Sequence, residues 1–276
     1  MSADIRLAPS APRPMRVRLL GWWLFAEGRL RSMAAYIWTV LITAVGTPAL
    51  YLLAFGTGLG AVVGQSRPEG VDGVPYLVYL APALLLSTSM MTAAEEATFS
   101  VFGGFKWNPV SFAAAATPIS PAQIALGFLA ANLARCLLGA VAFVGIMALA
   151  GAAPSPWAPL ILLVDVLLVA AVAGPIMAFV ASQRDDRGQL SLIQRFVITP
   201  LMLFSGTYFP LETLPAALQW IGWASPLWHA VELGRACTYG HAVAPGMLAL
   251  HLGYLALLAV AGLALAALLF RRRLVS

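Results

Sequence analysis

The sequence predicts an all-α membrane protein with six transmembrane helices. Of its 276 residues, 61% are hydrophobic and only 10% are charged, whereas about a quarter are charged in an ordinary soluble domain. The mean hydropathy is +0.87. A soluble protein of this size cannot bury so much apolar surface, and a disordered chain would be rich in charge. Both classes are therefore excluded, and lipid is expected to be the main solvent.

Residues 1–31 predict a cytoplasmic tail followed by an amphipathic helix on the membrane surface. Basic residues are spread along this region, which is not typical of a secretory signal. From Met15 to Leu30, tryptophan and other apolar residues recur at helical spacing, as they do in interfacial helices. A simple basic segment beside the membrane is the alternative. Residues 32–276 then form the membrane domain.

Six apolar segments approach the length of about 20 residues that a membrane-spanning helix needs. Four of them contain proline, which membrane helices tolerate as a kink. An even number of spans places both termini on the same side of the membrane. The predicted spans cover about residues 34–55, 76–96, 124–150, 157–182, 192–209 and 247–270.

Arginine and lysine predict the orientation. If both termini are cytoplasmic, 13 of the 16 basic residues are cytoplasmic, whereas Arg67 and Arg235 lie outside. This bias follows the positive-inside rule, so we expect a multi-pass protein of the cytoplasmic membrane. Topology and anionic lipid explain the basic residues, and no nucleic-acid partner is expected. The 13 residues are Arg6, Arg13, Arg16, Arg18, Arg29, Arg31, Lys106, Arg184, Arg187, Arg195, Arg271, Arg272 and Arg273.

Two ionisable residues are predicted to lie inside the membrane. Arg135 and Asp165 are about 17 Å and about 26 Å from the cytoplasmic ends of the third and fourth spans. Charges are costly in lipid, so both are functional candidates. They are expected to pair if the two spans touch. The pair is then either a structural lock or part of a polar substrate path or proton relay.

The cytoplasmic end of the second span carries two adjacent carboxylates, Glu95 and Glu96. They mark either a solvated helix end or a hinge that leads into the next loop. No histidine or other base lies close enough in the sequence to predict acid–base catalysis with them.

No nucleotide-binding or metal-binding motif is recognised. A Walker-type phosphate loop requires Gly-x-x-x-x-Gly-Lys before Ser or Thr, and the single lysine, Lys106, is not in such a motif. Two cysteines and three histidines are too scattered for the three or four ligands of a zinc site. We therefore expect no cofactor on this chain, and any use of ATP requires another polypeptide.

Several stretches of the sequence are similar to those of a known family. They are YLLAFGTGLG (51–60), SMMTAAEEATFSVFGG (89–104), FVITPLMLFSGTYFPLETLP (196–215) and SPLWHAVELGR (225–235). These stretches resemble the permeases of ABC-2 type transporters, and most closely those that export nodulation factors (lipo-oligosaccharides) or drugs. The resemblance extends over nearly all of the chain from residue 20 onward.

The resemblance implies the membrane subunit of an ATP-driven exporter for an amphipathic substrate, such as a lipo-oligosaccharide, a drug or a lipid. Two permeases, expected to form a homodimer, would assemble with two copies of an ABC ATPase that binds ATP and Mg.

Two further elements follow from the resemblance. A cytoplasmic coupling helix within residues 100–115 would contact the ATPase after two glycines and Pro109 interrupt the second-span helix. Its expected contact residues are Phe102, Phe105, Lys106 and Trp107. An outer re-entrant helical hairpin would precede the last span. The candidate functional residues of this hairpin are Pro210, Trp220, Trp223, His229 and Glu232.

Two other functional classes are weaker interpretations. A secondary, proton-coupled transporter would show two similar halves or interrupted helices with polar midplane sites, and no clear internal repeat is visible. An intramembrane lipid-modifying enzyme needs catalytic polar residues clustered at one membrane depth, and no such cluster is evident. The ATP-driven exporter is therefore the preferred prediction.

Overall fold

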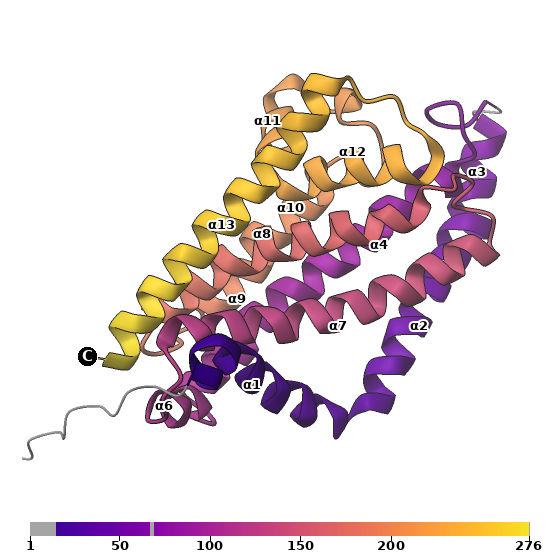
Figure 1. Cartoon of the computed structure of the whole chain (residues 1–276). Coiled ribbons are helices and arrows are strands. Elements are labelled where there is room, and N and C mark those ends of the chain that lie inside the picture. The colour runs from indigo at the N-terminus through magenta and orange to yellow at the C-terminus, as the bar shows by residue number, and fades with distance from the viewer. Residues whose placement is uncertain (1–14, 67–68, 276) are drawn as a thin grey trace, which may run out of the picture.

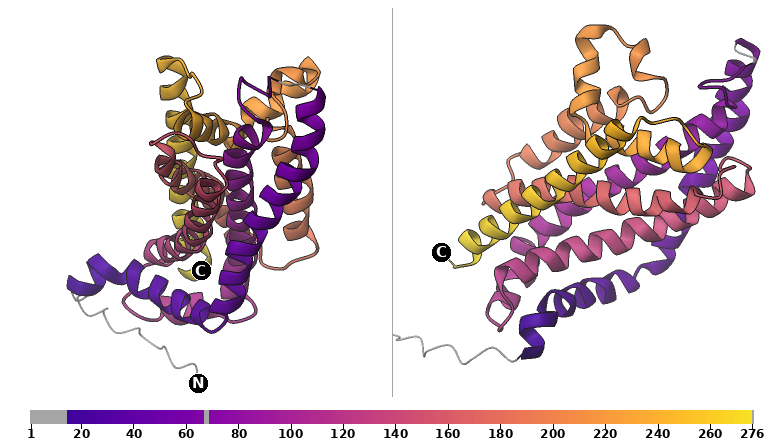
Figure 2. Two further views of the ribbon diagram at one scale, coloured as in Figure 1. Left: turned by 90° about the vertical axis from the view of Figure 1, so that its right-hand side faces the viewer. Right: turned by 45° about the horizontal axis from the view of Figure 1, so that its top comes forward.

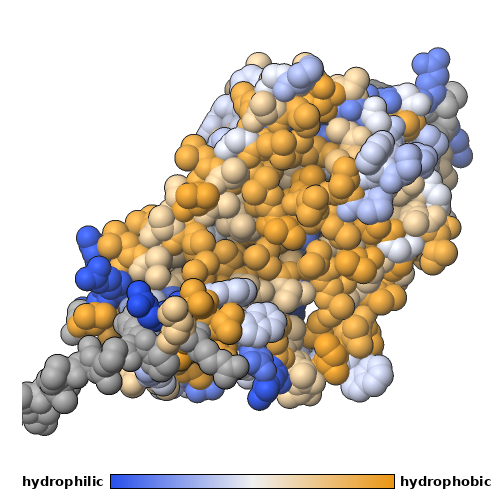
Figure 3. Space-filling model, viewed as in Figure 1, coloured by the Kyte–Doolittle hydropathy of each residue, from blue (hydrophilic) through white to orange (hydrophobic). Residues whose placement is uncertain are grey.

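The computed structural model describes residues 15–66 and 69–275, and this part of the chain is helical with no β-strand. Long helices lie side by side in a slanted bundle (Figure 1). On the face shown in Figure 3, a broad hydrophobic band crosses the middle, while hydrophilic residues gather near the C-terminal end of α13 and at the opposite upper corner. This polarity is typical of a membrane protein.

Five helical segments of the described chain are long and apolar enough to cross a membrane. They contain α2 (Ile37–Leu53), α4 (Tyr76–Glu95), α7 (Pro121–Leu149), α8 (Ile161–Ser182) and α13 (Pro245–Val275). They correspond to the first, second, third, fourth and sixth predicted spans. With their short extensions the segments are Ile37–Val63, Tyr76–Phe105, Pro121–Leu149, Ala158–Ser182 and Pro245–Val275.

The fifth predicted span is shorter than expected. It consists of α9 (Gln189–Ile193), a π-helical turn at Gln194–Ile198 and α10 (Thr199–Phe204). The helix ends five residues before the predicted end at residue 209, because Gly206 adopts a left-handed conformation with φ of 69°. The segment Gln189–Phe204 is apolar but below the length of the five other segments.

The second-span helix continues further than predicted. After α4 it passes through a π-helical turn at Glu96–Ser100 and α5 (Val101–Phe105). The expected interruption by the two glycines and Pro109 lies at residues 106–109: both glycines are still helical in α5, where Gly104 packs closely inside the bundle, and the helix ends at Phe105. A Cβ atom there would lie 2.7 Å from Cζ of Phe128. A separate short helix, α6 (Val110–Ala115), follows Pro109.

Helices α8 and α13 form the most extensive helix pair of the bundle. Glycines allow their backbones to approach closely, as small residues do in many membrane helix pairs. A Cβ atom added to Gly262 would lie 2.3 Å from Cδ of Pro175, and one added to Gly174 would lie 2.9 Å from the backbone nitrogen of Leu263. This contact fixes the C-terminal ends of both helices beside each other.

Helix α1 (Met15–Ala34) lies across the lower end of the bundle and turns sharply into α2 (Figures 1 and 2). It packs against α7, where Phe25 and Ala26 are buried. The side-chain amide of Gln123 on α7 donates to the carbonyl oxygens of Val17 and Arg18 at 2.8 and 3.0 Å. Protein contacts thus hold one face of α1.

The opposite end of the bundle carries α3 (Gly60–Ser66), α11 (Ala216–Ala224) and α12 (Pro226–Tyr239) (Figure 1). The predicted start of a helix at Ser225-Pro226 is confirmed, because the Ser225 hydroxyl accepts a hydrogen bond from the Leu227 backbone nitrogen. Helix α12 packs against both α4 and α8. The C-terminal end of α13, α1 and α6 lie at the other end of the molecule.

Candidate functional site

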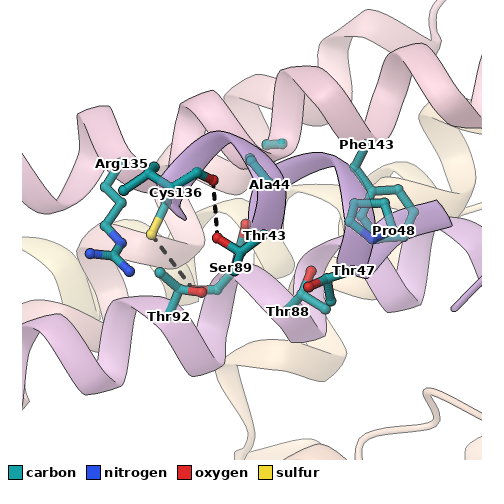
Figure 4. Close-up of a pocket in the computed structure, with 13 residues that line it drawn as sticks. Thr43, Ala44, Thr47, Pro48, Thr88, Ser89, Thr92, Arg135, Cys136 and Phe143 are labelled. Atoms are coloured by element: carbon teal, nitrogen blue, oxygen red, sulfur yellow. Dashed lines mark hydrogen bonds between the residues drawn. The ribbon is translucent and has the colours of Figure 1, made fainter. Parts of the chain in front are cut away.

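A small groove of about 120 Å³, lined by both polar and apolar side chains, lies between α2, α4 and α7. Figure 4 shows Thr43 and Thr47 on α2 facing Thr88 and Thr92 on α4. Each pair is four residues apart and therefore shares one helix face. The groove is lined by Val40, Thr43, Ala44, Thr47, Pro48, Thr88, Ser89, Thr92, Arg135, Cys136, Gly139, Ala140 and Phe143.

Two of the four threonine hydroxyls in this groove donate to backbone carbonyl oxygens of their own helices. Oγ1 of Thr43 donates to the carbonyl oxygen of Thr39 at 2.9 Å, and Oγ1 of Thr88 donates to that of Leu85 at 2.8 Å. Each hydroxyl oxygen keeps its capacity to accept a hydrogen bond. Arg135 adds donors and Phe143 adds an apolar wall. The groove can therefore accommodate hydroxyl or amide groups of an amphiphile.

Arg135 forms an ion pair with Glu96, and this pair joins α7 to the second-span helix. Nη1 of Arg135 lies 2.7 Å from Oε1 of Glu96, and the two side chains are only 27% and 19% exposed. Oε2 of Glu96 also accepts from the Ser100 hydroxyl at 2.6 Å, across the π-helical turn. Such turns are frequent at functional sites. The neighbouring Glu95 is exposed, so the two predicted hinge carboxylates have different surroundings.

The predicted pairing of Arg135 with Asp165 is wrong. Contact between two neighbouring helices does not by itself bring two particular side chains together, and the face of α7 that carries Arg135 meets Glu96 instead. Asp165 on α8 is 1% exposed. Within the described residues neither of its carboxyl oxygens has a hydrogen bond, although the Ser89 hydroxyl interacts with it electrostatically. It lies outside the lining of the groove.

The segment predicted to contact an ATPase is only partly exposed. Phe102 and Phe105 are buried within the chain, which corrects their expected place on an outer surface. The Phe105 ring packs against Phe270 on α13, with ring centroids 4.9 Å apart. Trp107 is 64% exposed. Lys106 is exposed but pairs with Asp185, whose Oδ1 lies 2.7 Å from Nζ.

A network of charged side chains connects α12 to the loop before α4. Arg235 donates to Glu232 at 3.1 Å and to the Gly206 carbonyl oxygen at 2.8 Å, and it lies over the Tyr79 ring. His241 bridges two carboxylates: Nε2 is 3.3 Å from Glu232, and Nδ1 is 2.5 Å from Asp72. The network therefore connects α12 to α4 and to the preceding loop.

The network also shifts two pKa values. Hydrogen bonding to Glu232 and the nearby charge of Asp72 raise the pKa of His241 above its ordinary value. Burial raises the pKa of Glu232, but the hydrogen bond from His241 and the charge of Arg235 outweigh it, so the net pKa is lowered. His241 thus keeps the charged form that pairs with both carboxylates to a higher pH than a free histidine does.

The remaining residues that the sequence predicted for an outer hairpin have different surroundings. Trp220 and Trp223 are exposed, at 61% and 55%. His229 is buried, with Nδ1 2.7 Å from Nδ1 of His251 on α13 and Nε2 3.0 Å from the Trp223 carbonyl oxygen. Pro210 directly precedes a short helical turn at Leu211–Thr213. No group of three potential metal-ligating side chains occurs in the described part of the chain.

Sequence reasoning missed the partners in this network. Glu232 is a candidate residue in the sequence analysis, but its ion pair with Arg235 is not predicted there, although a spacing of three residues on a helix places the two side chains together. Nothing in the sequence indicates the contact with Asp72, because it joins segments more than 160 residues apart. The sequence analysis did not identify the groove, although Thr43 and Thr47 on α2 and Thr88 and Thr92 on α4 share the spacing of one helix face.

Comparison with known proteins agrees with this architecture. Residues 24–239 match the ABC-2 type transporter family. Nodulation protein J of Neorhizobium galegae is 31% identical over 235 residues, which cover 85% of this chain and 86% of that protein. Nodulation protein J of Rhizobium leguminosarum bv. viciae is 29% identical over 231 residues, covering 82% and 85%.

A relative from a different group of bacteria aligns over a similar range. The inner membrane transport permease YadH of Escherichia coli strain K12 is 26% identical over 217 residues, covering 76% of this chain and 78% of that protein. The family match covers more than three quarters of the sequence and includes both the groove and α12. The chain therefore belongs to the ABC-2 type transporter family.

Proposed function

We propose that this chain is the membrane subunit of an ATP-driven exporter that moves an amphipathic substrate out of the cytoplasm or the inner leaflet. The family match over residues 24–239 carries the proposal. In this proposal the chain transports rather than catalyses, and ATP and Mg bind to a separate ABC ATPase. Candidate substrates are a lipo-oligosaccharide, a drug or a lipid.

The proposed membrane topology keeps six spans. Five are the long segments, and the shorter helix Gln189–Phe204 is the remaining one. Helix α1 lies at the cytoplasmic surface, and α11 and α12 form the outer re-entrant hairpin. The exposure of Trp220 and Trp223 supports a position at the membrane interface, where tryptophan is enriched.

The proposed assembly contains two copies of this chain and two ATPase subunits. In this proposal the two copies pair along α2, which the rest of the chain leaves largely uncovered. Trp38, Ile42 and Leu50 are 75%, 69% and 67% exposed. A second copy packed there would add the close side-chain packing that drives association of helices in lipid.

Reconstitution tests the function directly. The chain alone in lipid vesicles should neither hydrolyse ATP nor transport, because it lacks a Walker phosphate loop. With its ATPase it should move a fluorescent lipid or amphipathic dye in an ATP-dependent manner, in a particle with two copies of each subunit. A control ATPase without its catalytic carboxylate should abolish transport. Transport by the chain without any ATPase would contradict the proposal.

Cysteine labelling tests the proposed orientation. In a Cys136→Ala, Cys237→Ala background, cysteines at exposed Thr117 and Arg187 should be protected from an impermeant thiol reagent in intact cells. The reason is the concentration of basic residues on that side. Cysteines at exposed Glu69 and Ala216 should react. Permeabilised cells serve as the control, in which all four should react, and the opposite pattern in intact cells would reverse the orientation.

We propose that Trp107 and α6 provide the contact to the ATPase, with Lys106 and Asp185 supporting the segment from within the chain. The exposed Trp107 ring has the size of an interface anchor, so Trp107→Ala should weaken binding of the ATPase by about 2 kcal/mol or about 30-fold. Trp157→Ala is the matched control, because Trp157 is 67% exposed in the loop between α7 and α8. Copurification and ATPase stimulation measure the effect. Equal behaviour of the two variants would place the coupling contact elsewhere.

We propose that the groove between α2, α4 and α7 binds the polar part of the substrate. Gly139 lines it, and a side chain there would meet open space. Gly139→Leu should fill the groove of about 120 Å³ and reduce ATP-dependent transport at least tenfold without loss of expression. Gly145→Leu is the control, since Gly145 also faces open space on α7 but lies outside the lining. Full transport by the Gly139→Leu variant would exclude the groove.

A further inference from the structure

A basic hollow lies at the end of the bundle where α13 terminates. Its volume is about 590 Å³, and it is bounded by the ends of α5, α8 and α13 and by α6. Four of the residues that line it are basic: Lys106, Arg184, Arg272 and Arg273. The groove described above and the outer network contribute no residue to it.

The four basic side chains are not equivalent. Lys106 is balanced by Asp185 at 2.7 Å. Arg273 has a structural role, because Nη1 donates to the Val180 carbonyl oxygen at 3.0 Å and its guanidinium lies 4.0 Å above the Phe105 ring. Arg184 and Arg272 are exposed and form no ion pair within the described residues. The lining of the hollow thus contains four cations and no carboxylate, and Asp185 pairs with Lys106.

The other walls of the hollow are apolar. Phe105, Phe112 and Leu269 line it beside the arginines. In Figure 3 the hydrophobic band meets hydrophilic residues near the end of α13. The hollow combines the same two kinds of side chain, which match the head group and the acyl chains of a lipid. Basic pockets between membrane helices at this level suit the head groups of anionic lipids.

From these observations we infer that the hollow binds the phosphate of an anionic phospholipid. Arg184 and Arg272 supply the donors, since guanidinium groups pair with phosphate in a bidentate manner. Arg273 and Lys106 contribute positive potential from positions fixed by their own partners. The acyl chains lie along the apolar walls. The bound lipid connects α6 with the ends of α8 and α13, and this inference does not depend on ATP-driven transport.

A charge-matched pair of variants tests the site in the purified full-length chain. Arg184→Gln with Arg272→Gln removes the two unpaired arginines of the hollow, and Arg187→Gln with Arg271→Gln removes the same charge from neighbouring positions outside its lining. Native mass spectrometry with added phosphatidylglycerol measures retention of the lipid. The first variant should bind at least tenfold more weakly than the unmodified chain, and the second should change less than about twofold.

Further arms identify the ligand and confirm folding. Phosphatidylcholine, which has no net charge, should show no difference among the variants, and millimolar inorganic phosphate should not displace the bound phosphatidylglycerol. Arg184→Lys with Arg272→Lys keeps the charge and should retain part of the binding, and helical content by circular dichroism should be unchanged in every variant.

Three outcomes would overturn the inference. Equal losses in the two glutamine variants would mean a general surface-charge effect. Displacement by inorganic phosphate would mean a site for free phosphate. Unchanged lipid binding in the Arg184→Gln, Arg272→Gln variant, with loss of ATPase assembly, would mean that the hollow receives an acidic surface of the partner protein.

Discussion

The close contact of α8 and α13 is the constraint on which the arrangement at the C-terminal ends of these two helices depends. Because Gly262 lies against Pro175, the two helices run side by side to their C-terminal ends. That alignment brings Arg273 to the carbonyl oxygen of Val180 and to the ring of Phe105. One backbone contact near the middle of the bundle thus determines which side chains meet at the surface where α6 lies.

The bundle contains few charged side chains, and several of them form ion pairs that join neighbouring helices or loops. Glu96 and Arg135 meet where a π-helical turn interrupts the regular second-span helix, so the pair joins two spans at a point of altered geometry. At the end of the bundle that carries α12, Arg235 and His241 connect this helix to the preceding loops through Glu232 and Asp72. Both ion clusters involve helices that contact the second span. At each cluster, movement of one helix would displace the charged partner on its neighbour.

The sequence predicted the elements of this fold better than the faces they present. Hydropathy located five spans, and Ser225-Pro226 located the start of α12, because length and capping are local properties. The pairing of Arg135 with Asp165 failed because distance along a helix does not determine the direction of a side chain around it. The prediction that Phe105 is exposed was wrong, because its packing partner, Phe270, lies 165 residues away in the sequence.

The attachment of α1 has a consequence for how its sequence can vary. Gln123 binds main-chain carbonyl oxygens at Val17 and Arg18, which almost any amino acid would present there. The side chains at those positions can therefore change over evolutionary time while the contact persists. Gly21 cannot change so freely, because a Cβ atom there would lie 2.8 Å from the Gln123 side chain. Among homologues of this chain, the amino acids at positions 17 and 18 should therefore vary widely, whereas position 21, which faces Gln123, should remain glycine.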